Sequence, residues 1–256
     1  RDGLSDRHIL LAEAYRPEQM EKFRADAKRF MQYILSAAPF DSLRHNFNFY
    51  AVECPSADSL TDMPGDSVYA RTALHSSFYT FGTPRYLTTF DAFALHNAAG
   101  NVAYDHIYVV VNTPRYGGGG FYNHYSMTAA DHALAAPVVV HEFGHGFAGL
   151  ADEYYTSGVA FSEYYNKNVE PWEPNLTTLT AFGKKWKSML PPEIPVPTPR
   201  KAEYSGETGV FEGGGYSDKG IYSPAMDCRM KSNLAKGFCP VCQEAIRKMV
   251  RYYSGE

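Results

Sequence analysis

Two histidines and a glutamate stand close together near the middle of the chain, in the order His141-Glu142-Phe143-Gly144-His145. If this stretch is helical, side chains four residues apart project from one face about a turn apart, so both imidazoles can bind one zinc ion. Glu142 can then reach a water at the metal without being a ligand itself, as a general base does. The pattern indicates zinc-assisted hydrolysis of a peptide bond.

The residues around this motif predict the helix that it needs. Pro137 suits a first helical turn, the following Val138–Val140 run is apolar, and Gly149 suits the position just after a helix. In so apolar a helix, two histidines and a glutamate would be costly to bury without a metal. The surroundings therefore favour a metal site over a chance match.

A catalytic zinc usually has three protein ligands, so one more is needed. Asp152 follows the helix-ending Gly149 by three residues, as the third ligand does in metzincins, although both come one residue later after the second histidine than in those enzymes. We favour Asp152, with Glu153 as the alternative and a distant residue as the remaining option. The carboxylate that does not bind the metal would lie next to the ligands and orient them.

Other residues are candidates for completing the site. Tyr222, Tyr154 and His124 could each donate a hydrogen bond to the oxyanion that develops during hydrolysis. Metzincins also carry a methionine turn beneath the metal, and we prefer Met230 over Met226 for that position.

A run of four glycines, Gly117–Gly120, follows a predicted strand. It lacks the spacing and the trailing Lys-Ser/Thr of a phosphate-binding loop, so nucleotide binding is not indicated. Two interpretations are compatible: a flexible turn, or a segment without side chains that lets a substrate backbone lie close to the next strand. Gly118, Gly119 and Gly120 are therefore candidate substrate-binding residues.

Hydrophobic periodicity predicts an α/β (α+β) fold with a mixed twisted sheet and a C-terminal helical subdomain, and the histidine motif, if it binds zinc, makes this fold zincin-like. We expect one catalytic domain over residues 1–256, with an alternative division into a sheet and zinc helix (1–150) and a loop-rich lower part ending in a helix (151–256). The expected elements are strands at 8–14, 46–53, 105–112 and 121–127, a helix whose first turn holds Pro17, and a terminal helix from Pro240.

Composition excludes several classes of function. The net charge is −4, only 20% of residues are charged, and no basic cluster alternates with aromatic residues, so we expect no nucleic-acid partner. No apolar run is long enough to span a membrane. The chain opens without an initiator methionine or a hydrophobic signal core, so we expect a mature or trimmed fragment.

Four cysteines are present, three of them near the C-terminus. We favour a structural disulfide from Cys228 to Cys239 or Cys242. Free thiols are the first alternative, and a four-cysteine zinc site that also includes Cys54 is the second.

The phrase from His141 to Tyr155 resembles the bacterial IgA-peptidase family of zinc metallopeptidases, in which His-Glu-Phe-Gly-His is followed shortly by Gly-Leu-Ala-Asp-Glu-Tyr. The resemblance continues through Asn112 with Tyr116–Gly120, and through Cys228–Met230 with Phe238–Cys242. It implies zinc ligation by His141 and His145, with Glu142 as the base. The third ligand is not among the residues that it assigns.

The resemblance also implies a secreted, periplasmic or surface-exposed bacterial enzyme acting on protein or peptide substrates, including host immunoglobulin or another secreted glycoprotein. We carry over peptide-bond hydrolysis and leave the substrate open. Two further hypotheses stand beside a zinc endopeptidase: a non-catalytic module that binds host glycoprotein, and a zinc amidase or deacylase acting on small substrates.

Overall fold

The computed structural model describes residues 6–155 and 164–255. The chain forms two compact units: a sheet unit of Arg1–Phe147 with Val250–Glu256, and a loop unit of Ala148–Met249. The predicted subdomain boundary at residue 150 lies close in sequence to this division. The His-Glu-Phe-Gly-His motif belongs to the sheet unit, and both Asp152 and Glu153 belong to the loop unit.

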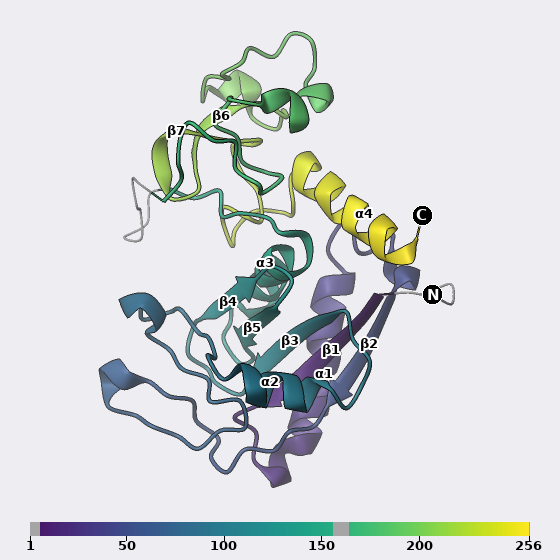
Figure 1. Ribbon diagram of the computed structural model, residues 1–256, viewed down its shortest axis with the longest axis vertical. Helices are drawn as coiled ribbons and strands as arrows, with labels where there is room; N and C mark the ends of the chain where they lie inside the picture. Colours follow the sequence, from purple (N-terminus) through teal and green to yellow (C-terminus); the bar gives the residue numbers. More distant parts are fainter. Residues whose placement is uncertain (1–5, 156–163, 256) are drawn as a thin grey trace. The chain divides into compact units, whose positions relative to one another are not determined.

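The sheet unit is built on a five-stranded mixed sheet with strand order β2-β1-β3-β5-β4 (Figure 1). Four strands run parallel, and the edge strand β4 is antiparallel to β5. This mixed sheet, with helices packed against it, confirms the predicted α+β fold class. The strands are β1 (Asp6–Glu13), β2 (Phe47–Val52), β3 (His106–Val111), β4 (Gly118–Phe121) and β5 (Tyr125–Ala129).

The chain begins with the predicted parallel β-α-β unit, in which helix α1 (Met20–Leu35) connects β1 to β2. Pro17 opens a 3-10 turn (Pro17–Gln19) that leads into α1, as its fixed φ allows. The apolar residues that recur at helical spacing, from Met20 to Ile34, are the ones that α1 buries. The sequence pattern thus predicted both the helix and its inner face.

The two faces of the sheet carry different residues, because side chains alternate along each strand. On one face, residues such as Ile9 and Val109 form an apolar core with Leu95 of helix α2 (Ala92–Ala99). On the other face, His106 packs edge-on against Phe143 of helix α3 (Ala135–Ala148). The helix that carries the motif therefore packs on the face of the sheet that contains the polar side chain of His106.

The prediction of a single strand over residues 121–127 was wrong. The structure has a β-hairpin there, with β4 ending at Phe121 and β5 beginning at Tyr125. Asn123 takes a left-handed conformation (φ 55°) in the turn between them, which asparagine tolerates better than most residues. The edge of the sheet is therefore formed by β4, which contains Gly118–Gly120 and ends at Phe121.

The loop unit contains little regular structure among its described residues. Strands β6 (Phe211–Gly214) and β7 (Ser217–Ser223) form a two-stranded antiparallel sheet. Helix α4 (Pro240–Ser254) begins at the predicted proline and belongs to this unit as far as Met249. Among the described residues, the short 3-10 helices of this unit are Phe182–Lys184, Lys187–Met189 and Ala202–Tyr204, and the remaining ones of the sheet unit are Arg44–Asn46, Pro64–Asp66 and Thr80–Gly82.

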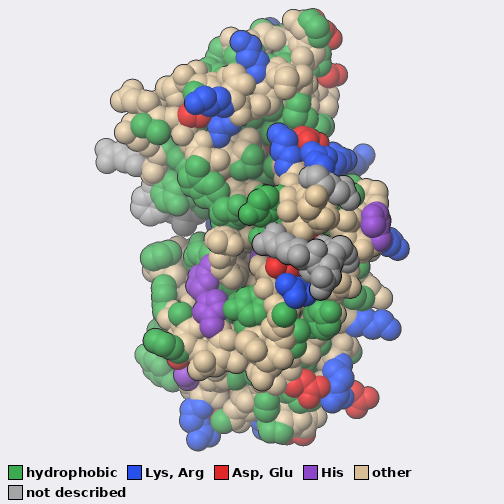
Figure 2. Space-filling view, turned by 45° about the vertical axis from the view of Figure 1, so that its right-hand side comes forward, with side chains coloured by type: hydrophobic (Ala, Val, Ile, Leu, Met, Phe, Trp, Pro, Cys, Tyr) green, Lys and Arg blue, Asp and Glu red, His purple; other side chains and the backbone are tan. Residues whose placement is uncertain are grey.

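The surface agrees with the near-neutral composition. Acidic and basic side chains are scattered among hydrophobic and polar ones on the face drawn in Figure 2. Within residues 6–155 and 164–255, no helix combines the length and the apolar character that crossing a membrane requires.

Candidate active site

Helix α3 brings the two motif histidines together. The Nε2 atoms of His141 and His145 lie 3.0 Å apart, and their rings meet nearly at right angles, at 86°. A tetrahedral zinc with bonds of about 2.05 Å would hold two imidazole nitrogens about 3.3 Å apart. Both side chains are partly exposed. The pair therefore fits a zinc ion with adjustments of a few tenths of an ångström.

Glu142 lies between the helix and the edge strand of the sheet. Its side chain is 9% exposed, and its main-chain carbonyl accepts a hydrogen bond of 2.8 Å from the Ser126 hydroxyl on β5. A methyl group placed on Gly118 would come within 2.8 Å of Glu142 Oε1. The carboxylate of the predicted base therefore packs directly against β4.

The glycine run is what allows this close packing. A Cβ atom at Gly120 would lie 2.5 Å from the Glu142 carbonyl oxygen and 2.8 Å from His145 Cβ, which real side chains do not tolerate. The predicted flexible turn was wrong, because these glycines pair with β5 as a regular edge strand. The outer edge of β4 is partly used by the chain itself, since the Leu87 amide donates to the Gly118 carbonyl at 3.3 Å.

Two buried histidines, which the sequence reasoning missed, support α3 from the sheet. His8 on β1 packs against Phe143 and Phe147, and His106 on β3 packs against Phe143. Burial lowers the pKa of His106 to about 3 and the pKa of His8 well below its ordinary value, so both are neutral. Their signal in the sequence is a histidine directly before the apolar run of each of two strands, and the strands pair these histidines with each other.

Asp152 belongs to the loop unit, where the turn between β6 and β7 holds it. The Tyr216 hydroxyl donates a short hydrogen bond to Asp152 Oδ2, and the Gly215 amide donates to the Asp152 carbonyl at 2.8 Å. Tyr216 was not predicted from the sequence. The glycines before it mark the tight turn, but its contact with Asp152 is non-local and leaves no trace in spacing.

Glu153 has a different environment from its neighbour. Its side chain is fully buried, and its Oε1 accepts hydrogen bonds from Asn175 Nδ2 at 3.0 Å and from the Cys242 thiol at 3.2 Å. Burial raises the pKa of the Glu153 carboxyl well above its ordinary value. With Glu153 engaged by an amide and a thiol, Asp152 is the better candidate for the third ligand.

Met230, the predicted methionine-turn residue, is fully buried in the loop unit. Its carbonyl accepts a hydrogen bond of 2.8 Å from the Glu153 amide, so it lies beside the segment with the two candidate carboxylates. Its role beneath a metal stays a prediction.

The three predicted oxyanion donors lie in different surroundings. The Tyr154 ring packs edge-on against Tyr216, at 5.4 Å between centroids. Tyr222 lies on β7 and exchanges main-chain hydrogen bonds with Thr177, and His124 stacks on His96. Of the three, only Tyr154 contacts the tyrosine that holds Asp152 among the described residues.

All four cysteines are free thiols, so the predicted disulfide from Cys228 is not present. The alternative of a zinc site that includes Cys54 was also wrong. The Cys54 thiol donates a hydrogen bond to the Ala12 carbonyl at 2.8 Å in the sheet unit, whereas Cys228 and Cys242 of the loop unit lie close to Glu153.

Comparison with known families agrees with the geometry of the motif helix. The family model for IgA peptidase M64 matches residues 5–204 and 200–250, which is most of the chain. No curated protein sequence matches it. Peptidases of the M64 family are metallopeptidases. The chain therefore belongs to the IgA peptidase M64 family, and it is a metallopeptidase.

Proposed function

We propose that this protein is a zinc-dependent endopeptidase whose metal is held by His141, His145 and Asp152. One observation supports this most strongly: on α3 the two Nε2 atoms converge to 3.0 Å beside a buried glutamate. Imidazole nitrogens at that separation, with a carboxylate next to them, suit zinc and a general base.

The third ligand is proposed by elimination and position. Asp152 follows Ala148, the last residue of α3, by four residues, so the chain itself keeps the carboxylate near the end of the helix. Glu153 is held by Asn175 and Cys242 and is less suited to the role. The hydroxyl of Tyr216 donates to Asp152 Oδ2, as outer hydrogen bonds orient ligating carboxylates.

In this proposal, Glu142 is the residue that moves the proton. A zinc ion in the site would polarise the scissile carbonyl and lower the pKa of the attacking water toward about 7. Glu142 takes a proton from that water and delivers it to the leaving amine. Its packing against Gly118 and Gly120 limits the directions in which the carboxylate can turn, which keeps it aimed at one position.

We also propose that an extended substrate pairs with the edge strand β4. Gly118 already accepts a hydrogen bond from the Leu87 amide, so the part of the edge that a substrate can use begins at Gly120. The same strand touches Glu142 and His145, which would bring a paired substrate to the reacting groups. We propose an extracellular protein as substrate, without naming it.

The test is the exchange of Glu142 for glutamine in the zinc-loaded protein. Glu142→Gln keeps the size and the packing of the side chain but removes the base, so zinc content should be unchanged and peptidase activity should fall by at least about 10³-fold. The exposed Glu207→Gln is the matched control and should retain activity.

Retained activity in Glu142→Gln would refute the mechanism. If the zinc-loaded wild type cleaves no protein or peptide but hydrolyses small acyl substrates, the amidase hypothesis replaces this one. If it hydrolyses neither, that result favours the hypothesis of a non-catalytic binding module.

A further inference from the structure

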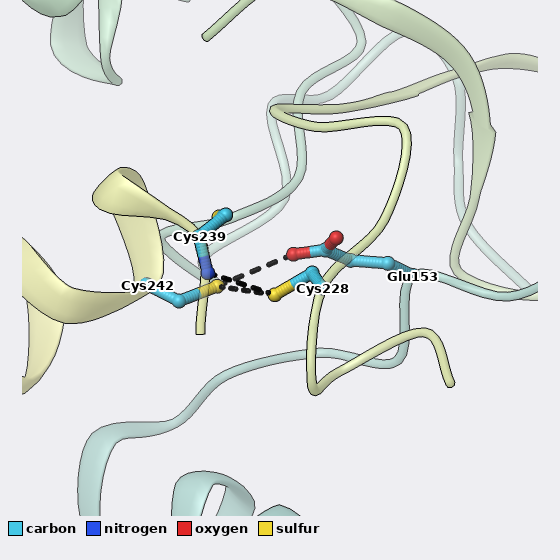
Figure 3. Close-up of side chains that lie close together, drawn as sticks. All are labelled: Glu153, Cys228, Cys239 and Cys242. Atoms are coloured by element: carbon cyan, nitrogen blue, oxygen red, sulfur yellow. Dashed lines mark hydrogen bonds between the residues drawn. The ribbon is translucent and has the colours of Figure 1, made fainter. Parts of the chain in front are cut away.

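A second group of metal-ligating side chains lies in the loop unit and takes no part in the proposed catalysis. The Sγ atoms of Cys228, Cys239 and Cys242 and a carboxylate oxygen of Glu153 all lie within 4.8 Å of one another. Figure 3 shows Cys228, Cys242 and Glu153 pointing toward one another. All four residues are buried, with Cys239 the most exposed at 6%.

The four residues come from three separate segments of the chain. Cys239 directly precedes α4 and Cys242 lies in its first turn, a spacing that puts two thiols beside one point at a helix start. Cys228 comes from the preceding loop, and Glu153 from the segment that follows α3. One bound ion would therefore join three segments of a unit that has little regular structure.

Two of the distances between these atoms are close to the edges of a tetrahedron around a metal. With bonds of about 2.3 Å, two sulfur ligands of a tetrahedral zinc lie about 3.8 Å apart. The Sγ atoms of Cys228 and Cys242 are 3.8 Å apart, and Glu153 Oε1 is 3.2 Å from Cys242 Sγ. A disulfide would need about 2.05 Å and would leave one thiol and the carboxylate behind.

One of the two carboxylate oxygens of Glu153 lacks a hydrogen-bond partner within the part of the chain that the structure describes. Glu153 Oε2 is buried and has no hydrogen-bond partner among the described residues. Lys231, the nearby cation, lies over the Tyr155 ring at 5.0 Å, and no ion pair joins it to Glu153 within the described ranges. A buried carboxylate oxygen is costly unless a cation or a donor meets it, and a metal ion among the thiols would do so.

Hydrogen-bond donors, one from the main chain and one from a side chain, are placed as in sites that hold a thiolate and a ligating carboxylate. The Cys239 amide donates to Cys228 Sγ at 3.3 Å, which stabilises negative charge on that sulfur. The Asn175 amide donates to Glu153 Oε1 at 3.0 Å and orients the carboxylate. Thiolate-rich tetrahedral sets select zinc among the common divalent metals.

We propose that Cys228, Cys239, Cys242 and Glu153 bind a structural zinc ion that holds the loop unit together. Four protein ligands close the coordination sphere, so this ion has no position for a substrate and serves stability. On binding, the three cysteines coordinate as thiolates and Glu153 as a carboxylate, the protons that these groups carry pass to solvent, and zinc undergoes no change of oxidation state. The proposal stands without the proposed peptidase mechanism, because it uses different ligands.

The test counts zinc in the purified full-length chain. Wild type and the control Cys54→Ser should each carry about two zinc ions, whereas Cys228→Ser and Glu153→Ala should each lose about one. His141→Ala should also lose about one zinc ion, and the zinc that it retains should be the ion bound by the cysteines. If His141→Ala removes all zinc, or if Cys228→Ser removes none, the proposal is wrong.

A second measurement covers the case in which the cysteine variants do not fold. Cobalt exchanged into wild type and into His141→Ala should show thiolate-to-metal charge-transfer absorption in both, because only the cysteine site supplies sulfur ligands. Absence of that absorption overturns the proposal. So does a Cys228–Cys239 or Cys228–Cys242 disulfide-linked peptide in a digest of the native protein.

Discussion

The two groups of metal-ligating residues in this chain are built in opposite ways. His141 and His145 stand on one turn of a single helix, are partly exposed, and are backed by a sheet with an extensive apolar core. The cysteines and Glu153 come from three segments, are all buried, and lie in a unit with little regular structure among its described residues.

The difference indicates what holds the ligands in place in each region. In the sheet unit the fold positions the ligands, because the helix and sheet are stabilised by apolar packing whether or not a metal is bound. In the loop unit, under the proposal above, a bound ion would help to position the fold, because it would join three segments that have little regular structure among the described residues. An open, preformed pair suits catalysis, and a closed set of four suits structure.

The strongest way to break this comparison is to remove the metals one after the other. A moderate chelator should take the partly exposed zinc first and lower activity by at least about 10³-fold. Tryptophan fluorescence should not change at this stage, because both tryptophans, Trp172 and Trp186, belong to the loop unit. A thiol reagent added with the chelator should then release the second zinc and shift the fluorescence to the red.

The shift is expected because Trp186 is only 2% exposed and donates a hydrogen bond of 2.7 Å to the Gly209 carbonyl, a contact that unfolding would break. Readdition of zinc after the first step should restore activity, which serves as the internal control. A single step in which activity, both zinc ions and fluorescence change together would contradict the division into an open and a closed site.

A smaller effect tests whether the sheet unit is preformed. Gly120→Ala would place a methyl group 2.5 Å from the Glu142 carbonyl and 2.8 Å from His145 Cβ, forcing helix and strand apart. A displacement of about 1 Å at reacting groups costs about 100-fold in turnover, so we expect that loss in kcat. The cysteine-bound zinc and the tryptophan fluorescence should not change.

Gly183→Ala is the matched control, since a Cβ atom there meets no other atom within 4 Å. It should keep wild-type kcat. Full activity in Gly120→Ala would show that the edge strand does not set the position of the motif helix.

The sequence predicted the first of the two groups better than the second. The His-Glu-Phe-Gly-His helix is local, so its periodicity, Pro137 and Gly149 sufficed to predict it, and Gly149 does take the left-handed φ of 61°. The apolar stripe of α1 and the parallel β1–β2 pair were predicted for the same reason.

What could not be predicted depends on contacts between distant segments. Glu153 meets Cys242 across 89 residues, and no spacing rule connects a carboxylate after one helix with thiols at the start of another. The prediction therefore paired Cys228 with another cysteine. The glycine run was misassigned because glycine has low strand propensity, and only packing against Glu142 explains its place in an edge strand.

The buried histidines behind α3 offer a pH test of the sheet unit alone. The folded-state pKa values of His8 and His106 lie below the unfolded value of 6.5, so at acid pH the unfolded chain binds more protons. The free energy of unfolding should therefore fall as the pH drops from about 6.5 toward 3. The loss is at most about 1.4 kcal/mol per pH unit for each histidine.

The measurement is urea denaturation followed by circular dichroism at several pH values, on wild type and on His106→Gln. In the variant, the free energy of unfolding should depend less steeply on pH, by the contribution of one histidine. His45→Gln, at an exposed position, should show the same pH dependence as the wild type. Asp6 contributes a slope of the opposite sign, because burial raises its pKa to about 8, and comparing chains that share Asp6 cancels it. An unchanged slope in His106→Gln would mean that this histidine is not held neutral by the fold.

The smallest expected effect is that of removing the Tyr216 hydroxyl, which donates a hydrogen bond to the proposed third ligand, Asp152. Tyr216→Phe removes only the hydroxyl that donates to Asp152 Oδ2, and loss of an outer hydrogen bond to a ligand typically weakens metal binding by about tenfold. Zinc affinity of the histidine-containing site should fall by that factor, whereas kcat at saturating zinc should change less. Tyr69→Phe, at a side chain that is 73% exposed, should leave the affinity unchanged. Asp152→Asn gives the reference value for the loss of zinc affinity. If Asp152→Asn leaves zinc affinity unchanged, Asp152 is not a ligand. If it weakens zinc binding while Tyr216→Phe does not, the Tyr216 hydroxyl stabilises the loop and does not contribute to metal binding.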